Sequence, residues 1–143
     1  MLTTRQSTFS LVLAGLLMGG TCSAASDIPN LVGTWVVESE GGVLALPGGP
    51  RVNVHHSGEF SKLKGEAVVT KQEGRIVHGV FTSPRAKERF IGAITMDNKR
   101  FYFADEDGIM EGDFIDNDKL NIVYRHVTPT DTVIGVGTWT RKP

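Results

Sequence analysis

Cysteine is almost absent from this chain of 143 residues: Cys22 is the only one. A disulfide framework is therefore excluded, and the folded part must be held together by its core and its hydrogen bonds. No stretch keeps a helical repeat of apolar residues over three turns, which argues against a helical domain. The 15 basic and 16 acidic residues nearly cancel. The charge balance thus offers no electrostatic reason to expect nucleic acid or an anionic membrane as a partner.

Long apolar runs are also missing, apart from one near the N-terminus. Residues 11–18 form an apolar stretch that is too short to cross a membrane, with Arg5 before it and the small residues Ser23-Ala24-Ala25 after it. This pattern predicts a secretory signal peptide over residues 1–25, cleaved after Ala25 or Ala24. We therefore expect a periplasmic or secreted protein without a transmembrane segment. The alternative is a lipoprotein acylated at Cys22, but the Leu usual three positions earlier is absent.

The chain instead has many short runs of Val, Ile, Phe, Tyr and Thr, separated by Gly, Asp, Asn and Pro. This pattern predicts an all-β fold in one domain over residues 26–143. The predicted strands cover residues 31–38, 64–72, 75–82, 88–95, 100–105, 108–115, 119–127 and 131–141. Most of the turns between them are tight, so eight antiparallel strands in an up-and-down (meander) β-barrel are expected.

The tetrapeptide Val-Gly-Thr-Trp occurs twice, at Val32–Trp35 and Val136–Trp139, in the first and last predicted strands. Matching first and last strands suggest that the two pair and close the barrel, which removes open sheet edges. Antiparallel order then places both Trp residues at one end, with the tightest turns; we call it the closed end. The connections 39–63, 83–87, 106–107 and 128–130 gather at the opposite, open end, where a ligand would enter.

The connection 39–63 is the longest. It contains Gly41-Gly42 and Pro47-Gly48-Gly49-Pro50, which we expect to lie outside any strand interior. Residues 52–55 alternate in polarity, so they form either an extra short strand or part of a longer second strand.

Alternation along the strands predicts which side chains face the barrel interior. The predicted inward set is Phe101, Phe103, Met110, Gly112, Phe114, Leu120, Ile122 and Tyr124, and the predicted outward set is Glu111, Asp113, Asn121 and Arg125. The strands 75–82 and 88–95 are apolar on both faces. Their outer faces are expected either to form a homo-oligomer contact or to lie under the 39–63 connection.

Gly33-Thr34-Trp35 on the first strand of such a meander resembles the calycin superfamily, which includes lipocalins and avidins. In lipocalins a Gly-x-Trp packs at the closed end under an Arg from near the last strand. The resemblance implies that Gly33, Trp35, Trp139 and Arg141 close the barrel, with Arg141 stacked over Trp35; such a cation–π contact contributes about 0.5–2 kcal/mol. The polar residues that avidins place shortly after this Trp are replaced by Val36-Val37, so biotin is not expected as the ligand.

Neither a metal nor a cofactor is expected. The acidic turns at 105–107 and 116–118 lie at opposite ends of the strand 108–115, so they do not form one calcium site. His55, His56, His78 and His126 show no ligand spacing, although the long connection could bring His55 or His56 near His126 at the open end. No catalytic residue is assigned; Asp105 and His126 are the best pair for acid–base chemistry.

These observations lead to three functional hypotheses. In the first, the barrel binds a small apolar or anionic molecule, with Phe103, Met110 and Tyr124 lining the pocket and His126 and Arg85 at its rim. In the second, the protein is an interaction protein or enzyme inhibitor that acts through the Gly/Pro-rich segment 39–50. The third is a small barrel enzyme of the isomerase or cyclase type.

Overall fold

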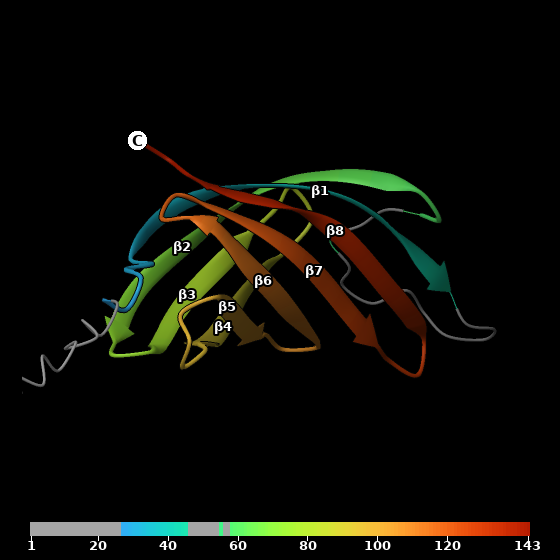
Figure 1. The fold of residues 1–143 in the computed structure, drawn as a ribbon. Helices are drawn as coiled ribbons and strands as arrows, with labels where there is room; N and C mark the ends of the chain where they lie inside the picture. Colours follow the sequence, from blue (N-terminus) through green and yellow to red (C-terminus); the bar gives the residue numbers. More distant parts are fainter. Residues whose placement is uncertain (1–26, 46–54, 56–57) are drawn as a thin grey trace, which may run out of the picture.

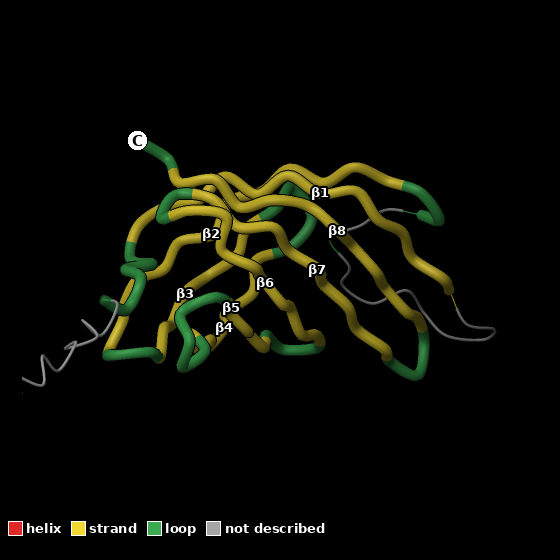
Figure 2. The backbone as a smooth tube through the Cα atoms, viewed as in Figure 1, coloured by secondary structure: helices red, strands yellow, loops and turns green. Residues whose placement is uncertain are grey.

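The computed structural model describes residues 27–45, 55 and 58–143, which form eight antiparallel strands (Figure 1). The strands are β1 (Gly33–Ala45), β2 (Ser61–Glu73), β3 (Ile76–Thr82), β4 (Lys87–Ile94), β5 (Arg100–Ala104), β6 (Gly108–Asp116), β7 (Lys119–Val127) and β8 (Asp131–Arg141). From β2 onward the connections are short loops, and the described part of the chain has no helix (Figure 2). The predicted signal peptide, with Cys22, lies outside the described residues.

Each strand pairs with its neighbour in sequence, and β1 also pairs with β8, so the sheet closes into a barrel. The seam between β1 and β8 runs from Trp35 opposite Arg141 to Ala45 opposite Asp131. The prediction that the two Val-Gly-Thr-Trp strands pair is therefore confirmed, as is the eight-stranded meander.

The prediction that Gly41-Gly42 lies outside a strand was wrong. Strand β1 continues through both glycines to Ala45, and β2 begins at Ser61, so the connection between them is shorter than expected. A side chain at Gly42 would collide with the backbone carbonyl of Glu59. Glycine therefore marks a close approach of two backbones here, not the end of a strand. Pro47–Pro50 and residues 52–54 lie outside the described residues.

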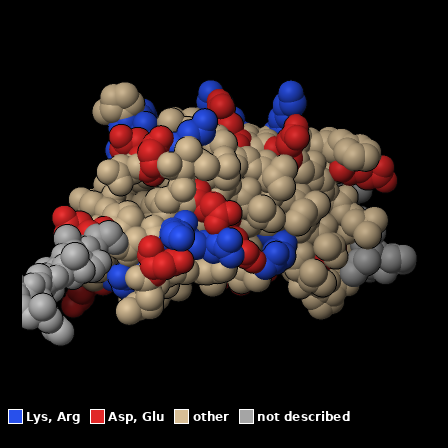
Figure 3. All heavy atoms as spheres, viewed as in Figure 1, with Lys and Arg blue, Asp and Glu red and all other residues tan. Residues whose placement is uncertain are grey.

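The interior is filled as the alternation predicted. Phe101, Phe103, Met110, Leu120 and Ile122 are buried in one cluster with Trp35 and Trp139, while Phe114 and Tyr124 are partly buried against it. On the outer surface, side chains of opposite charge pair across strands, such as Arg100 with Asp113 and Arg125 with Glu111. Figure 3 shows the two charges interspersed over the face in view.

The closed end is plugged by Arg141, as the resemblance implied. Its guanidinium carbon lies 4.2 Å from the centre of the Trp35 ring. The guanidinium donates to the backbone carbonyls of Asn30 (2.6 Å) and Val32 (3.0 Å) and to the Asp118 carboxylate (2.6 Å). Beneath it, the Trp35 indole N–H donates to the carbonyl of Leu31, whose side chain is fully buried. The chain segment before β1 is thus tied across the barrel floor.

The outer faces of β3 and β4 are open among the described residues. Ile76 and Ile91 are 44% and 49% exposed, so nothing described covers them. The homo-oligomer contact predicted for this surface stays a prediction. Within the described residues, no helix is long and apolar enough to span a membrane.

Candidate functional site

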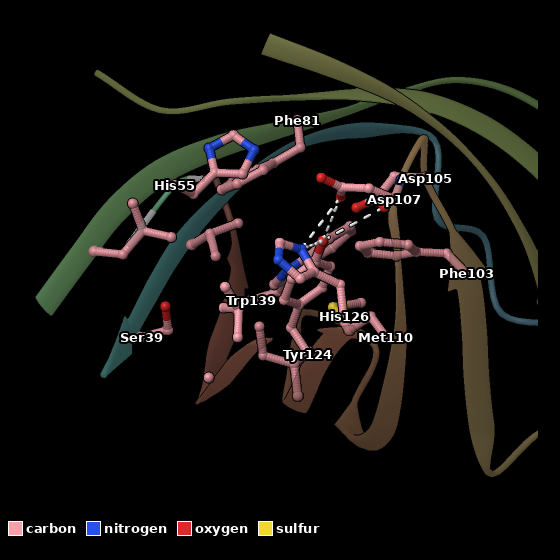
Figure 4. A pocket seen from close by; sticks show the side chains of 15 residues that line it. Ser39, His55, Phe81, Phe103, Asp105, Asp107, Met110, Tyr124, His126 and Trp139 are labelled. Carbon is pink, nitrogen blue, oxygen red and sulfur yellow. Dashed lines mark hydrogen bonds and ion pairs between the residues drawn. The ribbon is translucent and has the colours of Figure 1, made fainter. Parts of the chain in front are cut away.

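A cavity opens into the barrel from the open end (Figure 4). It measures about 40 Å³ and lies within about 560 Å³ of atom-free space that includes its mouth. One water molecule needs roughly 10–15 Å³ of such enclosed volume. The enclosed part of the cavity is therefore narrow, but it can hold more than a single water molecule. Its walls combine apolar residues (Val37, Leu63, Phe81, Phe103, Met110, Ile122, Val133 and Trp139) with polar ones (Ser39, His55, Asp105, Asp107, Tyr124 and His126).

The floor of the cavity is aromatic. The Trp139 ring lies 5.7 Å from Phe103, 5.8 Å from Phe90 and 6.1 Å from Phe101 between ring centres. The prediction that both Trp residues lie at the closed end therefore fits Trp35, whereas the ring of Trp139 also lines the cavity. Its partner across the seam is Val37, two residues further into the barrel than Trp35, and the centres of the two Trp rings lie 6.2 Å apart.

Three carboxylates gather at the rim of this cavity. One oxygen each from Glu88, Asp105 and Asp107 lies within 4.8 Å of the other two. Glu88 is the second residue of β4 and is only 3% exposed. Burial raises the pKa of the Asp105 carboxyl, and the charges of Glu88 and Asp107 raise it further. These three residues could hold a metal ion or another cation, because carboxylate oxygens are suitable ligands for both.

Asp105 also shapes the β5–β6 turn. Its Oδ1 accepts the backbone N–H of Gly108 at 2.6 Å and that of Asp107 at 3.3 Å. This side chain therefore has a local structural role that Asp107 does not share, since the Asp107 side chain points toward Tyr124 and His126.

His126 lies between two carboxylates at the inner end of the rim. Its Nε2 is 2.9 Å from Asp131 Oδ1, and its Nδ1 is 3.4 Å from Asp107 Oδ1. Asp131 is fully buried, and its Oδ1 also accepts the Thr128 hydroxyl at 2.8 Å. In the part of the chain that the structure describes, its Oδ2 has no hydrogen-bond partner. Nε2 of His126 is therefore directed at the buried Asp131, and Nδ1 is directed toward Asp107 at the cavity.

Tyr124 connects His126 to the carboxylates. Its hydroxyl donates to Asp107 at 3.0 Å and lies 3.4 Å from His126 Nδ1. Burial and the neighbouring carboxylates raise the pKa of this phenol, so it stays a neutral hydrogen-bond donor. The ring fits here because Gly108 has no side chain; a Cβ atom at that position would collide with the ring.

On the opposite wall, His55 approaches Glu88. Its Nε2 is 3.1 Å from Glu88 Oε2, its Nδ1 is 2.6 Å from Ser83 Oγ, and its ring lies 4.5 Å from that of Phe81. Two histidines therefore lie at the mouth, and Figure 4 shows His126 directed toward Asp107.

Four of the five residues predicted to contact a ligand share this cavity: Phe103, Met110, Tyr124 and His126. Arg85 does not line it, because it is exposed in the turn between β3 and β4. The proposed acid–base pair of Asp105 and His126 is also not the one observed. The carboxylates closest to His126 are those of Asp131 and Asp107.

Glu88 and Asp131 were missed, although alternation could have found both. Glu88 shares its strand face with Phe90, and Asp131 shares its face with Val133, Gly135 and Trp139. Polar residues in an otherwise inward-facing set indicate a buried polar site. The approach of His55 to the mouth was anticipated only as one alternative.

Comparison with known proteins adds no assignment. No protein-family model matches the chain, and no curated protein or solved structure is significantly similar to it.

Proposed function

We propose that this protein binds a small, partly apolar molecule in the open-end cavity of its barrel. The observation that carries the proposal is the cavity itself, with an aromatic floor and hydrogen-bonding groups concentrated at its mouth. Ligand sites commonly combine apolar walls with a few convergent polar groups. Apolar contact with Trp139 and Phe103 would supply affinity, and the rim groups would orient the ligand.

The resemblance to calycins supports the same proposal, since the closed end is built as that resemblance implies. We also propose that the chain is exported to the periplasm or beyond and cleaved after Ala25. N-terminal sequencing of protein isolated from its own cells tests this: a first residue of Ser26 is expected, and retention of residues 1–25 would contradict it.

A second candidate function is acid–base catalysis of the isomerase or cyclase type. The pair of His126 and buried Asp131 favours it, because a carboxylate that fixes one imidazole nitrogen leaves the other available for proton transfer. The inhibitor hypothesis stays a prediction, because residues 46–50 of the segment 39–50 that would act lie outside the described residues.

Native mass spectrometry of protein purified from the cells that make it tests the binding proposal. An extra mass that dissociates on denaturation is expected for the unaltered protein. Met110→Trp, which fills the cavity, should abolish it. Met96→Trp is the matched control, because Met96 is 83% exposed in the turn between β4 and β5 at the closed end. An unliganded protein, or a mass that survives in Met110→Trp, would contradict the proposal.

A further inference from the structure

We infer that the ligand of this cavity is an amphipathic amine, with its ammonium group at Asp105 and Asp107 and its apolar part against Trp139. This inference rests on the proposed function, since it names the chemical class of the molecule bound there. It departs from the expectation of an anionic ligand, which depended on Arg85 at the rim.

The sign of the charge around the cavity is the first argument. Asp105, Asp107, Glu88 and Asp131 all lie at or just behind the mouth. In the described part of the chain, no Lys or Arg forms an ion pair with Asp105, Asp107 or Asp131; their cationic partner is a histidine at most. An anionic group placed here would face several carboxylates at short range, which disfavours it.

Asp131 adds a further carboxyl group behind this end of the cavity, where it pairs with His126 and Thr128. This carboxyl group is fully buried, and its Oδ2 has no hydrogen-bond partner among the described residues. It acts on the cavity through His126, whose ring separates Asp131 from Asp107. A buried acceptor without a partner is costly, and a cation nearby lowers that cost.

The spacing of the rim oxygens suits an ammonium group. One oxygen each from Asp105, Asp107 and Glu88 lies within 4.8 Å of the other two. Because Glu88 is paired with His55, the N–H bonds of an ammonium group would be donated chiefly to Asp105 and Asp107. Below these oxygens the wall becomes apolar, with Met110, Phe103 and the ring of Trp139. A molecule with a charged amine at one end and a slim hydrocarbon part at the other matches both regions.

A divalent metal ion is the competing occupant of the same carboxylates. Calcium prefers six to eight oxygen ligands, and the cluster supplies three side chains. A metal would also leave the aromatic floor without a role in binding. The amine accounts for both halves of the cavity, so we favour it.

The test compares three probes of one length that differ in charge: hexylamine, hexanol and hexanoate at neutral pH. Binding is followed by the NMR shift of the Trp139 indole N–H, with the Trp35 indole, which is tied to Leu31 at the closed end, as an internal reference. Hexylamine should bind at least about tenfold more tightly than hexanol, and hexanoate more weakly than either. In Asp107→Asn, the ratio of the affinity for hexylamine to the affinity for hexanol should fall toward one.

Asp113→Asn is the matched control, since Asp113 pairs with Arg100 on the outer surface and should leave the preference unchanged. The comparison of probes on the unaltered protein is decisive even if Asp107→Asn does not fold. Equal binding of amine and alcohol would overturn the amine inference and leave the proposed function standing. If Zn²⁺ or Ca²⁺ binds more tightly than hexylamine, and if this binding is lost in Asp107→Asn, the carboxylate cluster is a metal site instead. Binding of none of the probes would overturn both.

Discussion

The two ends of this barrel use the same kinds of side chain for opposite purposes. At the closed end, the guanidinium of Arg141 stacks on the ring of Trp35 and pairs with the carboxylate of Asp118. It also donates to two backbone carbonyls, so each of its nitrogens has a partner. At the open end, aromatic, basic and acidic groups surround a space and leave it empty of protein atoms. At the closed end the polar groups meet with no space between them, which stabilises the fold, whereas at the open end they surround a cavity that a ligand can enter.

The contrast predicts that the largest loss of stability follows truncation at the closed end. Trp35→Ala removes a fully buried ring that contacts Trp139 and lies under Arg141. We expect the free energy of unfolding in urea to fall by about 3–5 kcal/mol. Phe81→Ala at the mouth, where the ring is only partly buried, is the control. A larger loss for Phe81→Ala would remove the distinction between the two ends.

Substitution of Arg141 should have the next largest effect. Arg141→Ala removes the hydrogen bonds to the carbonyls of Asn30 and Val32 and the stacking on Trp35, and should cost about 2–3 kcal/mol. Arg141→Lys keeps the charge but not the planar fork, so it should recover less than half of this loss. Thermal and urea unfolding measure both. Full recovery by Lys would show that charge alone matters at this position.

At the open end, Tyr124→Phe should cost only about 1 kcal/mol, because it removes one hydroxyl that donates to Asp107 while the ring stays in place. Ligand binding should be affected more than stability, since the hydroxyl faces the cavity. Urea unfolding combined with the probe titration gives both numbers. A stability loss comparable to that of Arg141→Ala would show that the mouth, too, is chiefly structural.

The smallest effect on the free energy of unfolding is expected for Asp105→Asn. Unlike the other substitutions, this one should increase stability at neutral pH. The pKa of Asp105 is raised in the folded protein, so the folded state holds its proton up to a higher pH than the unfolded state does. Stability therefore falls as the pH rises from about 4 through the raised pKa, and this part of the loss should vanish in the variant. The amide oxygen can still accept the Gly108 N–H. Melting temperatures between pH 4 and 8 measure this, and a variant that is less stable at every pH would contradict it.

Features that depend on local alternation were predictable from the sequence, and those that depend on which side chains meet were not. The strand order, the inward face from Phe101 to Tyr124 and the pairing of the two Val-Gly-Thr-Trp strands all follow from periodicity. Gly41-Gly42 was misjudged because the backbone that approaches it belongs to a distant segment. The partner of His126 depends on the register of β7 against β8, which puts Val133 opposite it and Asp131 within reach.

The seam between β1 and β8 has a consequence for the order of folding. The hydrogen bond from the Arg141 guanidinium to the carbonyl of Val32 joins residues 109 positions apart, so it forms only after almost the whole chain is available. Contacts of such high sequence separation make barrel closure slow, because the entropy of a long loop must be overcome first. Until then β1 has one unpaired edge, which is open to pairing with other chains. The last dozen residues thus protect the first strand from aggregation, and truncation there should leave an aggregation-prone intermediate.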